Sequence, residues 1–319
     1  MEIVFLEAAS LGEDLDLSNF SSLGHVTTYP RSTLSEAAER VKKADVVVVN
    51  KIPMNGETLK EAGNLKLIAV TATGTNNIHW DFVKKKNITV ANVAGYSTDA
   101  VAQHTFALLF YILHKLNYYN RFVKEGGYCK CLTFSHFEEK FFELKGKRWG
   151  IVGMGAIGRR VAEIATAFGC EVQYTSTTGR NVGQPYPLVD LDTLLRTSDI
   201  VSLHAPLMPV TEGMMNAEAF AKMKPEAILV NVARGALVDE TALADALEKG
   251  VIAGAALDVL TDEPMRADHP LLRIQDSRKL IITPHIAWAP VETRERLMQE
   301  VYKNIEAFLR GKPRNVVEF

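Results

Sequence analysis

The sequence has few cysteines, no excess of charge of either sign and no long apolar run. Three cysteines in 319 residues give no basis for a disulfide framework, and they suit a reducing compartment, so we expect a cytoplasmic protein. Lys and Arg number 36 against 38 Asp and Glu, a net charge of −2. This balance shows no electrostatic footprint for nucleic acid or an anionic membrane, so we expect neither as a partner.

The longest apolar run, Phe106 to Leu113, is too short to cross a bilayer and predicts a buried helix. The first residues, 2–6, have the pattern of a strand and lack the basic region and cleavage site of a signal peptide. Cys129 and Cys131 could bind a metal in principle. No His or Cys lies at a spacing typical of a zinc site, however, so we expect no metal centre.

A glycine-rich turn near the middle of the chain is the strongest local signal. Residues 149–152 predict a buried strand, which is followed by Gly153, Gly155 and Gly158 at G-x-G-x-x-G spacing and then by a helix. The glycines permit a tight turn, a close approach to a pyrophosphate and close packing of helix on strand. The N–H groups at the start of the helix would face the phosphates. The pattern predicts a dinucleotide site, with an ordinary glycine turn as the alternative.

The alternation of strands and helices predicts an α/β protein with two doubly wound parallel-sheet domains. We expect a flavodoxin-like substrate domain at 1–98 and 289–319, and an inserted Rossmann cofactor domain at 99–288, with a cleft between them. Strands of the first domain are predicted at 3–6, 46–49, 67–70 and 88–91, and helices at 33–43, 56–62, 80–86 and 291–310. In the second domain we predict a helix at 99–116, an irregular connection at 118–146, and strands at 149–152, 172–175, 200–203, 228–232, 254–257 and 280–282.

Two polar loops follow predicted strands of the first domain, where ligands of such sheets usually bind. Lys51 could hold a substrate carboxylate, although a solvated loop lysine is an equally good interpretation. Thr73 and Gly74 could offer backbone N–H groups to an anion, or they could form a plain turn. We predict these residues as substrate-binding.

The residues that follow the predicted strand at 172–175 leave the choice of cofactor open. An acidic residue about 20 positions beyond the glycines would bind the ribose hydroxyls of NAD, and Ser176 stands in its place. Ser176 and Thr177 could hold NAD(H) through their hydroxyls, with Arg180 in solvent. Alternatively, Arg180 could accommodate the 2′-phosphate of NADP(H).

Three polar residues follow predicted strands of the second domain: Arg234, Glu263 and His285. Strand-end loops of one sheet converge, so these side chains can meet. A guanidinium binds a carboxylate and polarises a carbonyl, and an imidazolium can deliver a proton. A carboxylate against the other ring nitrogen favours the charged form. Singly, each has an ordinary explanation, as a turn cap, a surface acid and a core histidine respectively.

With these residues in place, the sequence resembles the D-isomer-specific 2-hydroxyacid dehydrogenases over nearly its whole length. The resemblance is carried by five motifs, at Gly153 to Gly158, Leu203 to Leu207, Asn231 to Gly235, Asp258 to Pro264 and Thr283 to His285. The ending His285-Ile-Ala-Trp288, together with Asn50-Lys51 and Gln103-His104, is most similar to the glycerate dehydrogenase/hydroxypyruvate reductase branch.

The resemblance implies that Arg234, Glu263 and His285 are the catalytic residues, and that Asp258 contacts the nicotinamide carboxamide. It also implies that the main chain of Thr73 and Gly74 holds the substrate carboxylate. The implied cofactor contacts include the glycine turn and the adenosine side, at Val101, Gly153, Met154, Gly155, Ala156, Ile157, Gly158, His204, Ala205, Pro206, Thr211, Val232, Ala233 and Ala287. His79 departs from the Asp that the family often has after the substrate loop. A homodimer joined through the cofactor domain is also implied, with 118–146 as the segment to inspect.

We expect NAD(P)-dependent reduction of a small 2-keto acid, of the hydroxypyruvate or glyoxylate type, to a D-2-hydroxy acid. His285 would give a proton to the carbonyl oxygen, Arg234 would orient the substrate, and Glu263 would keep His285 protonated until transfer. Two alternatives remain at this point. One is an NAD(H)-sensing, corepressor-like binding protein of the same fold, and the other is a formate or phosphite dehydrogenase.

Overall fold

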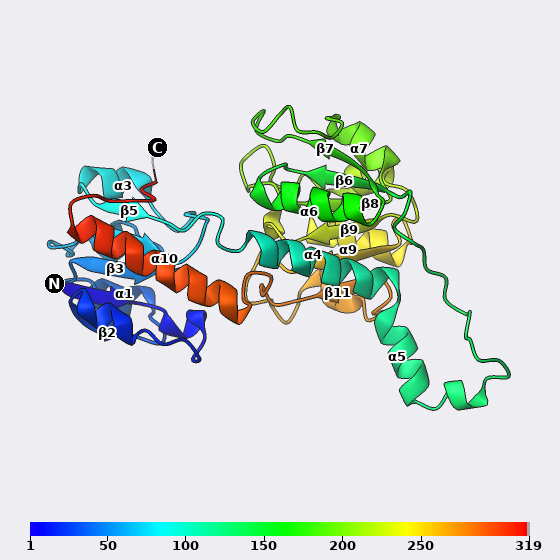
Figure 1. Ribbon diagram of the computed structural model, residues 1–319, viewed down its shortest axis with the longest axis horizontal. Coiled ribbons are helices and arrows are strands. Elements are labelled where there is room, and N and C mark those ends of the chain that lie inside the picture. The colour runs from blue at the N-terminus through cyan, green and yellow to red at the C-terminus, as the bar shows by residue number, and fades with distance from the viewer. Residues whose placement is uncertain (318–319) are drawn as a thin grey trace. The chain divides into compact units, whose positions relative to one another are not determined.

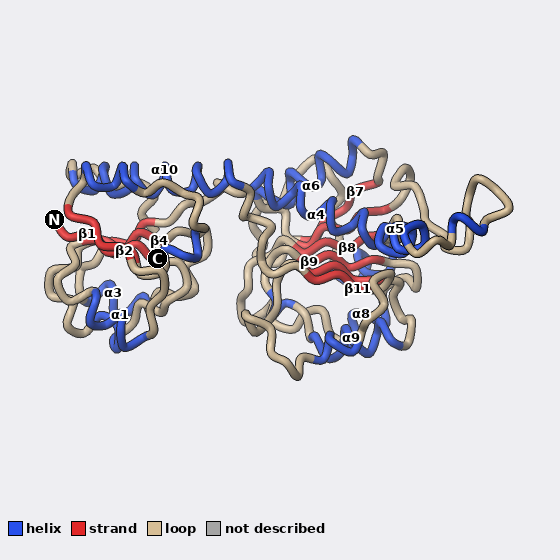
Figure 2. The backbone as a smooth tube through the Cα atoms, turned by 90° about the horizontal axis from the view of Figure 1, so that it is seen from below, coloured by secondary structure: helices blue, strands red, loops and turns tan. Residues whose placement is uncertain are grey.

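The computed structural model describes residues 1–317 and divides the chain into two compact units (Figure 1). The first unit contains residues 1–96 and the segment from Ala289 onward, and the second contains Ser97–Trp288. Within each unit, helices cover both faces of one parallel sheet (Figure 2). None of the helices in residues 1–317 has the length and apolar character that crossing a bilayer requires.

The first sheet has five parallel strands in the order β2-β1-β3-β4-β5, which is the flavodoxin-like order. The strands are β1 (Glu2–Phe5), β2 (His25–Thr28), β3 (Val46–Val49), β4 (Leu67–Val70) and β5 (Thr89–Ala91). Every residue of β3 and β4 is buried, as expected for central strands covered on both faces. The four predicted strands are confirmed to within one residue. Strand β2 is missing from the prediction because it lies at the sheet edge, and its half-exposed side chains give no apolar signal.

The helices of the first unit are α1 (Leu34–Arg40), α2 (Gly56–Leu59), α3 (Trp80–Lys85) and α10 (Val291–Leu309). Helix α1 begins with a capping box in which Thr33 and Glu36 satisfy each other's backbone N–H groups. Helices α1 and α2 each end three residues earlier than predicted. Helix α10 buries Leu297, Val301 and Ile305 along one side, as the four-residue spacing predicts. It covers the face of the sheet opposite α1 and α3 (Figure 2).

The second sheet has six parallel strands in the order β11-β10-β9-β8-β6-β7. They are β6 (Arg148–Val152), β7 (Glu171–Thr175), β8 (Ile200–Leu203), β9 (Ile228–Asn231), β10 (Gly254–Leu257) and β11 (Leu280–Ile282), which confirms all six predicted strands to within one residue. At the free edge of β7, Leu188 forms an isolated parallel bridge to Tyr174 of that strand. This bridge takes the place of strand 3 in the Rossmann order 3-2-1-4-5-6, so the topological switch point lies between β6 and β8.

Helix α4 (Thr98–Leu113) opens the second unit and packs against α6, β9 and β10. Its apolar run is buried at Phe106, Leu108, Leu109 and Ile112, which confirms the predicted buried helix. The helix ends three residues before the predicted Leu116, because Lys115 takes a left-handed backbone conformation with φ 54°.

Residues 118–124 correct the sequence prediction of an irregular connection, because they belong to helix α5 (Leu116–Lys124). The aromatic residues that looked scattered in the sequence lie on this helix and pack on the segment that follows it. The ring of Phe122 stacks on His136, with centroids 3.8 Å apart, and the Tyr118 hydroxyl lies 2.8 Å from His136 Nε2. Apart from a 3₁₀ turn at Tyr128–Lys130, residues 125–147 are irregular.

The remaining helices of the second unit are α6 (Ala156–Ala167), α7 (Leu191–Thr197), α8 (Ala217–Lys222) and α9 (Glu240–Glu248). Helices α4 and α6 cover one face of the sheet, and α8 and α9 cover the other (Figure 2). Two separate apolar clusters follow from this layering, one on each face. The loops at the carboxyl ends of the strands are thereby held on a rigid base.

Candidate active site

The glycine turn connects β6 to α6 at the switch point of the second sheet. Gly153 has φ +97°, and a side chain there would meet the backbone nitrogen of Ala205 at 2.7 Å. A side chain at Gly158 would collide with the carbonyl oxygen of Gly153. Gly155 is different, because a Cβ added there would meet no atom of the protein within 4 Å. The protein therefore explains the first and third glycines, and open space over Gly155 fits a ligand that approaches the backbone.

His204 follows β8, immediately beside the glycine turn. Its backbone N–H donates to the carbonyl oxygen of Val152 (2.8 Å), and its ring Nε2 lies 3.0 Å from the hydroxyl of Ser202. Nδ1 is buried and has no hydrogen-bond partner in residues 1–317. Burial lowers the pKa of His204 to about 3, so the ring is neutral at neutral pH. A buried ring nitrogen without a partner is a group that a bound nucleotide could satisfy.

The end of β7 carries the residues predicted to bind the ribose. The hydroxyl of Ser176 donates to the carbonyl oxygen of Arg180 (2.6 Å), and the N–H of Arg180 donates to the hydroxyl of Thr178 (3.2 Å). These contacts close a small loop whose side chains are exposed or half-exposed. The arrangement is compatible with both cofactors, so it leaves the choice between NAD(H) and NADP(H) open.

Arg234 lies three residues after β9, in a loop that a buried amide shapes. The Asn231 amide nitrogen donates to the carbonyl oxygen of Arg234 (2.8 Å), and its oxygen accepts the N–H of Ala233 (3.0 Å). A Cβ at Gly235 would collide with the backbone of Leu260, so this loop packs directly on the loop after β10. Sequence reasoning missed Asn231. A polar residue closing a buried apolar strand is the signal that could have found it.

Glu263 and His285 are in direct contact. Oε2 of Glu263 lies 2.7 Å from Nδ1 of His285, and the two side chains are 30% and 27% exposed. The N–H of Leu260 donates to Oε1 of Glu263 (3.1 Å). His285 has a left-handed φ of 55°, and its backbone N–H donates to the carbonyl oxygens of Asp258 (2.8 Å) and Thr283 (3.0 Å). Because Glu263 engages Nδ1, Nε2 is the ring nitrogen that can exchange a proton with a ligand.

Asp258 is the buried centre of this arrangement and is only 1% exposed. Its carboxylate accepts hydrogen bonds from the Thr283 hydroxyl (2.6 Å) and from the N–H groups of Ile286 and Ala287 (both 2.9 Å). His104 Nε2, on α4, lies 3.5 Å from the carboxylate and 3.0 Å from the Thr283 hydroxyl. Burial alone would raise the pKa of Asp258, but these donors outweigh it, and the pKa lies below its usual value. An ionised Asp258 therefore fixes the turn that carries His285.

Arg234, Glu263 and His285 thus follow β9, β10 and β11, which are three neighbouring strands of one sheet. The loops of Arg234 and Glu263 are in backbone contact, and Glu263 is hydrogen-bonded to His285. The sheet therefore carries all three residues at the carboxyl ends of adjacent strands, where the Arg234 guanidinium donates to the carbonyl oxygen of Ala233 (2.7 Å). This set can bind an anion and move a proton.

The other predicted cofactor residues differ in their surroundings. Thr211 is buried, donates to the carbonyl oxygen of Pro206 (2.8 Å) and accepts the N–H of Met208 (2.8 Å), so its hydroxyl holds the loop after β8. The others fall into three groups. Val101, Met154, Ala205, Val232 and Ala287 are buried, Ile157, Thr177 and Ala233 are half-buried, and Ala156 and Pro206 are exposed.

Lys51 belongs to a loop of the first unit that a carboxylate organises. Oε2 of Glu7 accepts the N–H groups of Asn50 (2.9 Å), Lys51 (2.9 Å) and Ile52 (3.1 Å). These three N–H groups form an anion-binding nest, and Glu7 fills it. The Lys51 side chain is exposed. The nest is therefore structural, and the ammonium group is what this loop can offer a ligand.

The Thr73 hydroxyl is already used inside the first unit, because it donates to the carbonyl oxygen of Val93 (2.9 Å). The N–H groups of Thr73 and Gly74 donate to no protein group in the described part of the chain. Two free N–H groups on a surface turn fit an anion such as a carboxylate. His79 precedes α3 in this unit, and its side chain makes no capping hydrogen bond to the described helix.

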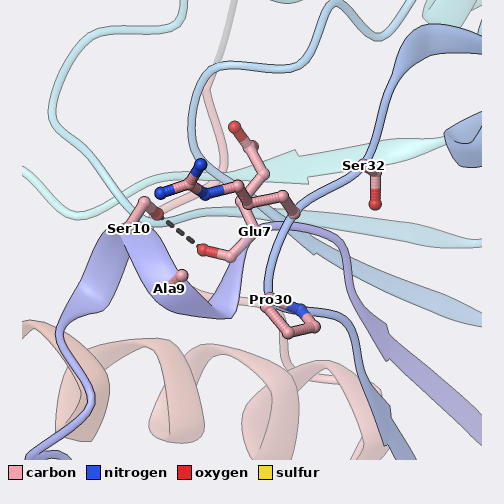
Figure 3. A pocket seen from close by; sticks show the side chains of 6 residues that line it. Glu7, Ala9, Ser10, Pro30 and Ser32 are labelled. Atoms are coloured by element: carbon pink, nitrogen blue, oxygen red, sulfur yellow. Dashed lines mark hydrogen bonds between the residues drawn. The ribbon is translucent and has the colours of Figure 1, made fainter.

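A pocket of about 340 Å³ opens at the carboxyl ends of β1 and β2 in the first unit (Figure 3). Glu7, Ser10, Arg31 and Ser32 are among its lining residues. Most of their polar groups are already bonded: the Ser10 hydroxyl donates to the carbonyl oxygen of Glu7 (2.7 Å, dashed in Figure 3), and the Ser32 hydroxyl donates to that of Leu6 (2.7 Å). The pocket therefore offers less chemistry than the strand ends of the second sheet.

Comparison with known proteins finds relatives that match nearly the whole chain. The family model for the D-isomer specific 2-hydroxyacid dehydrogenase NAD binding domain matches residues 106–287. A hydroxypyruvate reductase of Blautia hydrogenotrophica is 41% identical, and a glycerate dehydrogenase of Methylorubrum extorquens is 40% identical, each over 99% of both chains. A solved structure of an acyclic imino acid reductase in complex with NADPH and D-Arg has a TM-score of 0.89 and 31% identity over the full length of both chains.

The family match covers more than half of the chain, and the curated relatives match over nearly all of it. The resemblance predicted from the sequence motifs is therefore confirmed, as are the fold class and the nicotinamide cofactor. The chain belongs to the D-isomer-specific 2-hydroxyacid dehydrogenases, a family of oxidoreductases whose NAD-binding domain forms its second unit.

Proposed function

We propose that the protein reduces a small 2-keto acid, hydroxypyruvate or glyoxylate, to the D-2-hydroxy acid with NADH or NADPH. The observation that carries the proposal is the contact between Glu263 and His285 beside the Arg234 loop, at the ends of three adjacent strands. The names of the relatives, hydroxypyruvate reductase and glycerate dehydrogenase, favour this substrate class.

The cofactor would lie across the switch point of the second sheet. Gly155 and the start of α6 would hold its pyrophosphate, since a side chain at Gly155 would meet open space. Nδ1 of His204 is the buried group left for the nucleotide. Oδ2 of Asp258 accepts one N–H, from Ala287, and keeps an acceptor site for the nicotinamide carboxamide. When bound, the nicotinamide supplies the hydride for C2 of the keto acid.

The protein's own residues would bind the substrate and supply the proton. The guanidinium of Arg234 would orient the substrate and polarise its carbonyl. His285 would donate the proton on Nε2 to the carbonyl oxygen as that oxygen gains charge, and Glu263 would hold Nδ1 and stabilise the imidazolium. In the first unit, the N–H groups of Thr73 and Gly74 and the ammonium group of Lys51 are the groups we propose for the substrate carboxylate.

A steady-state panel tests this proposal. Hydroxypyruvate, glyoxylate, pyruvate and longer 2-keto acids are each assayed with NADH and with NADPH, and formate and phosphite are assayed with the oxidised cofactors. We expect turnover of the small 2-keto acids, with a clear preference for one cofactor. Turnover of formate or phosphite alone, or binding of NAD(H) without any turnover, would overturn the proposal in favour of the two alternatives.

We also propose a homodimer, in which the segment 116–146 contacts a second copy of the chain. Leu132, Phe134 and Phe137 are almost fully exposed there, and isolated monomers rarely expose such a group. Light scattering of the wild-type protein should give twice the monomer mass, and the triple variant L132S/F134S/F137S should give the monomer mass. An unchanged mass in the variant would remove this segment from the interface.

We further propose a cytoplasmic location, because Cys129, Cys131 and Cys170 are all free thiols and Cys129 is exposed. Recovery of the native protein in a membrane or periplasmic fraction would contradict this.

A further inference from the structure

Another histidine–carboxylate pair, Glu240 and His269, contacts the loop that carries Glu263. Nε2 of His269 lies 3.0 Å from Oε2 of Glu240, and these side chains are only 5% and 12% exposed. The other oxygen of Glu240, Oε1, accepts the N–H of Thr261 (2.9 Å). Glu240 is the first residue of α9, and neither Glu240 nor His269 belongs to the motifs that the sequence analysis identifies.

The two pairs meet at one backbone turn. The N–H of Leu260 donates to Glu263, and the N–H of the next residue, Thr261, donates to Glu240. Through Thr261 and His269, Glu240 holds both ends of the loop that carries Glu263. One carboxylate therefore holds the loop at two points, on either side of Glu263.

The hydrogen bonds of its two ring nitrogens determine which tautomer His269 adopts. Its Nδ1 accepts the N–H of Leu271 (3.3 Å), so Nδ1 carries no proton. Nε2 must then carry the proton and donate it to Glu240. Both ring nitrogens are used inside the protein, so His269 cannot exchange a proton with substrate. Its role is to hold the loop.

We propose that Glu240 and His269 are positioning residues that place the Glu263 carboxylate against Nδ1 of His285. The inference rests on the proposed function, since the Glu263–His285 pair is its proton-transfer machinery. Loss of the buried pair frees the loop, and Glu263 then moves relative to the imidazole. A misplacement of about 1 Å near the reacting groups can cost roughly 100-fold in rate.

The test compares Glu240→Ala, His269→Gln and His269→Asn with wild type. Gln at position 269 can still donate an N–H to Glu240, whereas Asn can replace only the acceptor at Nδ1. We expect kcat for hydroxypyruvate to fall about 10-fold to 100-fold in Glu240→Ala and His269→Asn, and much less in His269→Gln. The KM for the cofactor should change less than about twofold, because the glycine turn and His204, which would hold the nucleotide, follow β6 and β8 rather than β10.

The matched control is Glu218→Ala. Glu218 also lies in the first turn of a helix, but it is exposed and contacts Lys222 on its own helix. This variant should keep the wild-type kcat. A folded Glu240→Ala protein with kcat within twofold of wild type would overturn the inference. So would equal activities of His269→Gln and His269→Asn, which remains informative if Glu240→Ala fails to fold.

A measurement without substrate separates this inference from the proposed function. Long-range ¹H–¹⁵N spectra of ¹⁵N-histidine-labelled protein report which ring nitrogen of His285 carries the proton. At a pH where His285 is neutral, we expect a single tautomer protonated at Nδ1 in wild type and in His269→Gln, and a mixture in His269→Asn. An identical tautomer in all three proteins would overturn the positioning role. Absence of turnover in the wild type would overturn the proposed function alone.

Discussion

Two histidine–carboxylate pairs among those of the second unit, His269–Glu240 and His285–Glu263, have the same chemistry and differ in exposure. The His269–Glu240 pair is nearly buried and has both ring nitrogens engaged, whereas the His285–Glu263 pair is about one-quarter to one-third exposed and keeps Nε2 available. Because proton transfer to a ligand needs an accessible nitrogen, only the second pair can act on substrate. The comparison shows that burial and partner count distinguish a structural histidine from a candidate catalytic one.

The largest expected difference between the pairs comes from removing each histidine. His285→Asn keeps a residue type that tolerates the left-handed backbone, and we expect kcat to fall roughly 10²- to 10⁴-fold with a loss of stability of about 0–1 kcal/mol. His269→Ala leaves Glu240 buried without its partner and should destabilise the fold by about 3–5 kcal/mol. Steady-state kinetics and urea unfolding of both variants check this. Near-normal turnover of His285→Asn would remove it from the proton-transfer role.

A substitution at Gly235 should displace the backbone turn to which both carboxylates, Glu263 and Glu240, are hydrogen-bonded. Gly235 packs on the backbone of Leu260 and Thr261. The N–H of Leu260 donates to Glu263, and the N–H of Thr261 donates to Glu240. Gly235→Ala should cost about 3 kcal/mol of stability and most of the activity, because the added carbon meets backbone that cannot move aside. Gly155→Ala is the control: it should fold normally and bind cofactor weakly. Urea unfolding and fluorescence titration with NADH measure both effects. Equal stabilities would contradict the packing argument.

Asp258 sharpens the comparison because it is a buried carboxylate that accepts several hydrogen bonds and has no Lys or Arg partner in residues 1–317. Its pKa is lowered, so its contribution to stability is complete above the unfolded-state value of about 4 and is lost as pH falls through the folded-state value. Asp258→Asn should cost about 1.5–3 kcal/mol at neutral pH, and the difference from wild type should shrink below about pH 4. Urea unfolding across this pH range tests the sign. A constant difference would show that Asp258 is not ionised in the native state.

The effect that is smallest at neutral pH concerns His204, a buried histidine whose ring has no carboxylate partner in residues 1–317. Its pKa is about 3 in the folded protein against 6.5 in the unfolded chain, so the unfolded state binds more protons between these values. Its contribution is complete above pH 6.5 and is lost as pH falls towards 3, with a slope of at most about 1.4 kcal/mol per pH unit. His204→Asn should make stability less dependent on pH in this window. An unchanged slope would contradict the buried neutral ring.

The elements with a strong local signal could be predicted from the sequence. The apolar runs of β3, β4 and β8 leave few alternatives, and the predicted carboxyl ends of β9, β10 and β11 indicated which loops carry Arg234, Glu263 and His285. The prediction misses the edge strand β2 and helix α5, in neither of which any residue is buried.

The residues that support the site could not be predicted, because their roles depend on contacts between distant parts of the chain. His104 and Thr283 are 179 residues apart, and Glu240 and His269 are 29 apart. No local spacing indicates such partners. The roles assigned to Arg234, Glu263, His285 and the cofactor residues stay predictions that the experiments above test.

The link from α4 to Asp258 has a practical consequence for dissecting the molecule. The family match begins at residue 106, two residues after His104, while the compact second unit begins at Ser97. A fragment trimmed to the family boundaries would lack the imidazole that helps to anchor the aspartate, and it would lose about the first two turns of α4, a helix that packs on β9 and β10. A cofactor-binding fragment intended for crystallography or calorimetry should therefore start before residue 97.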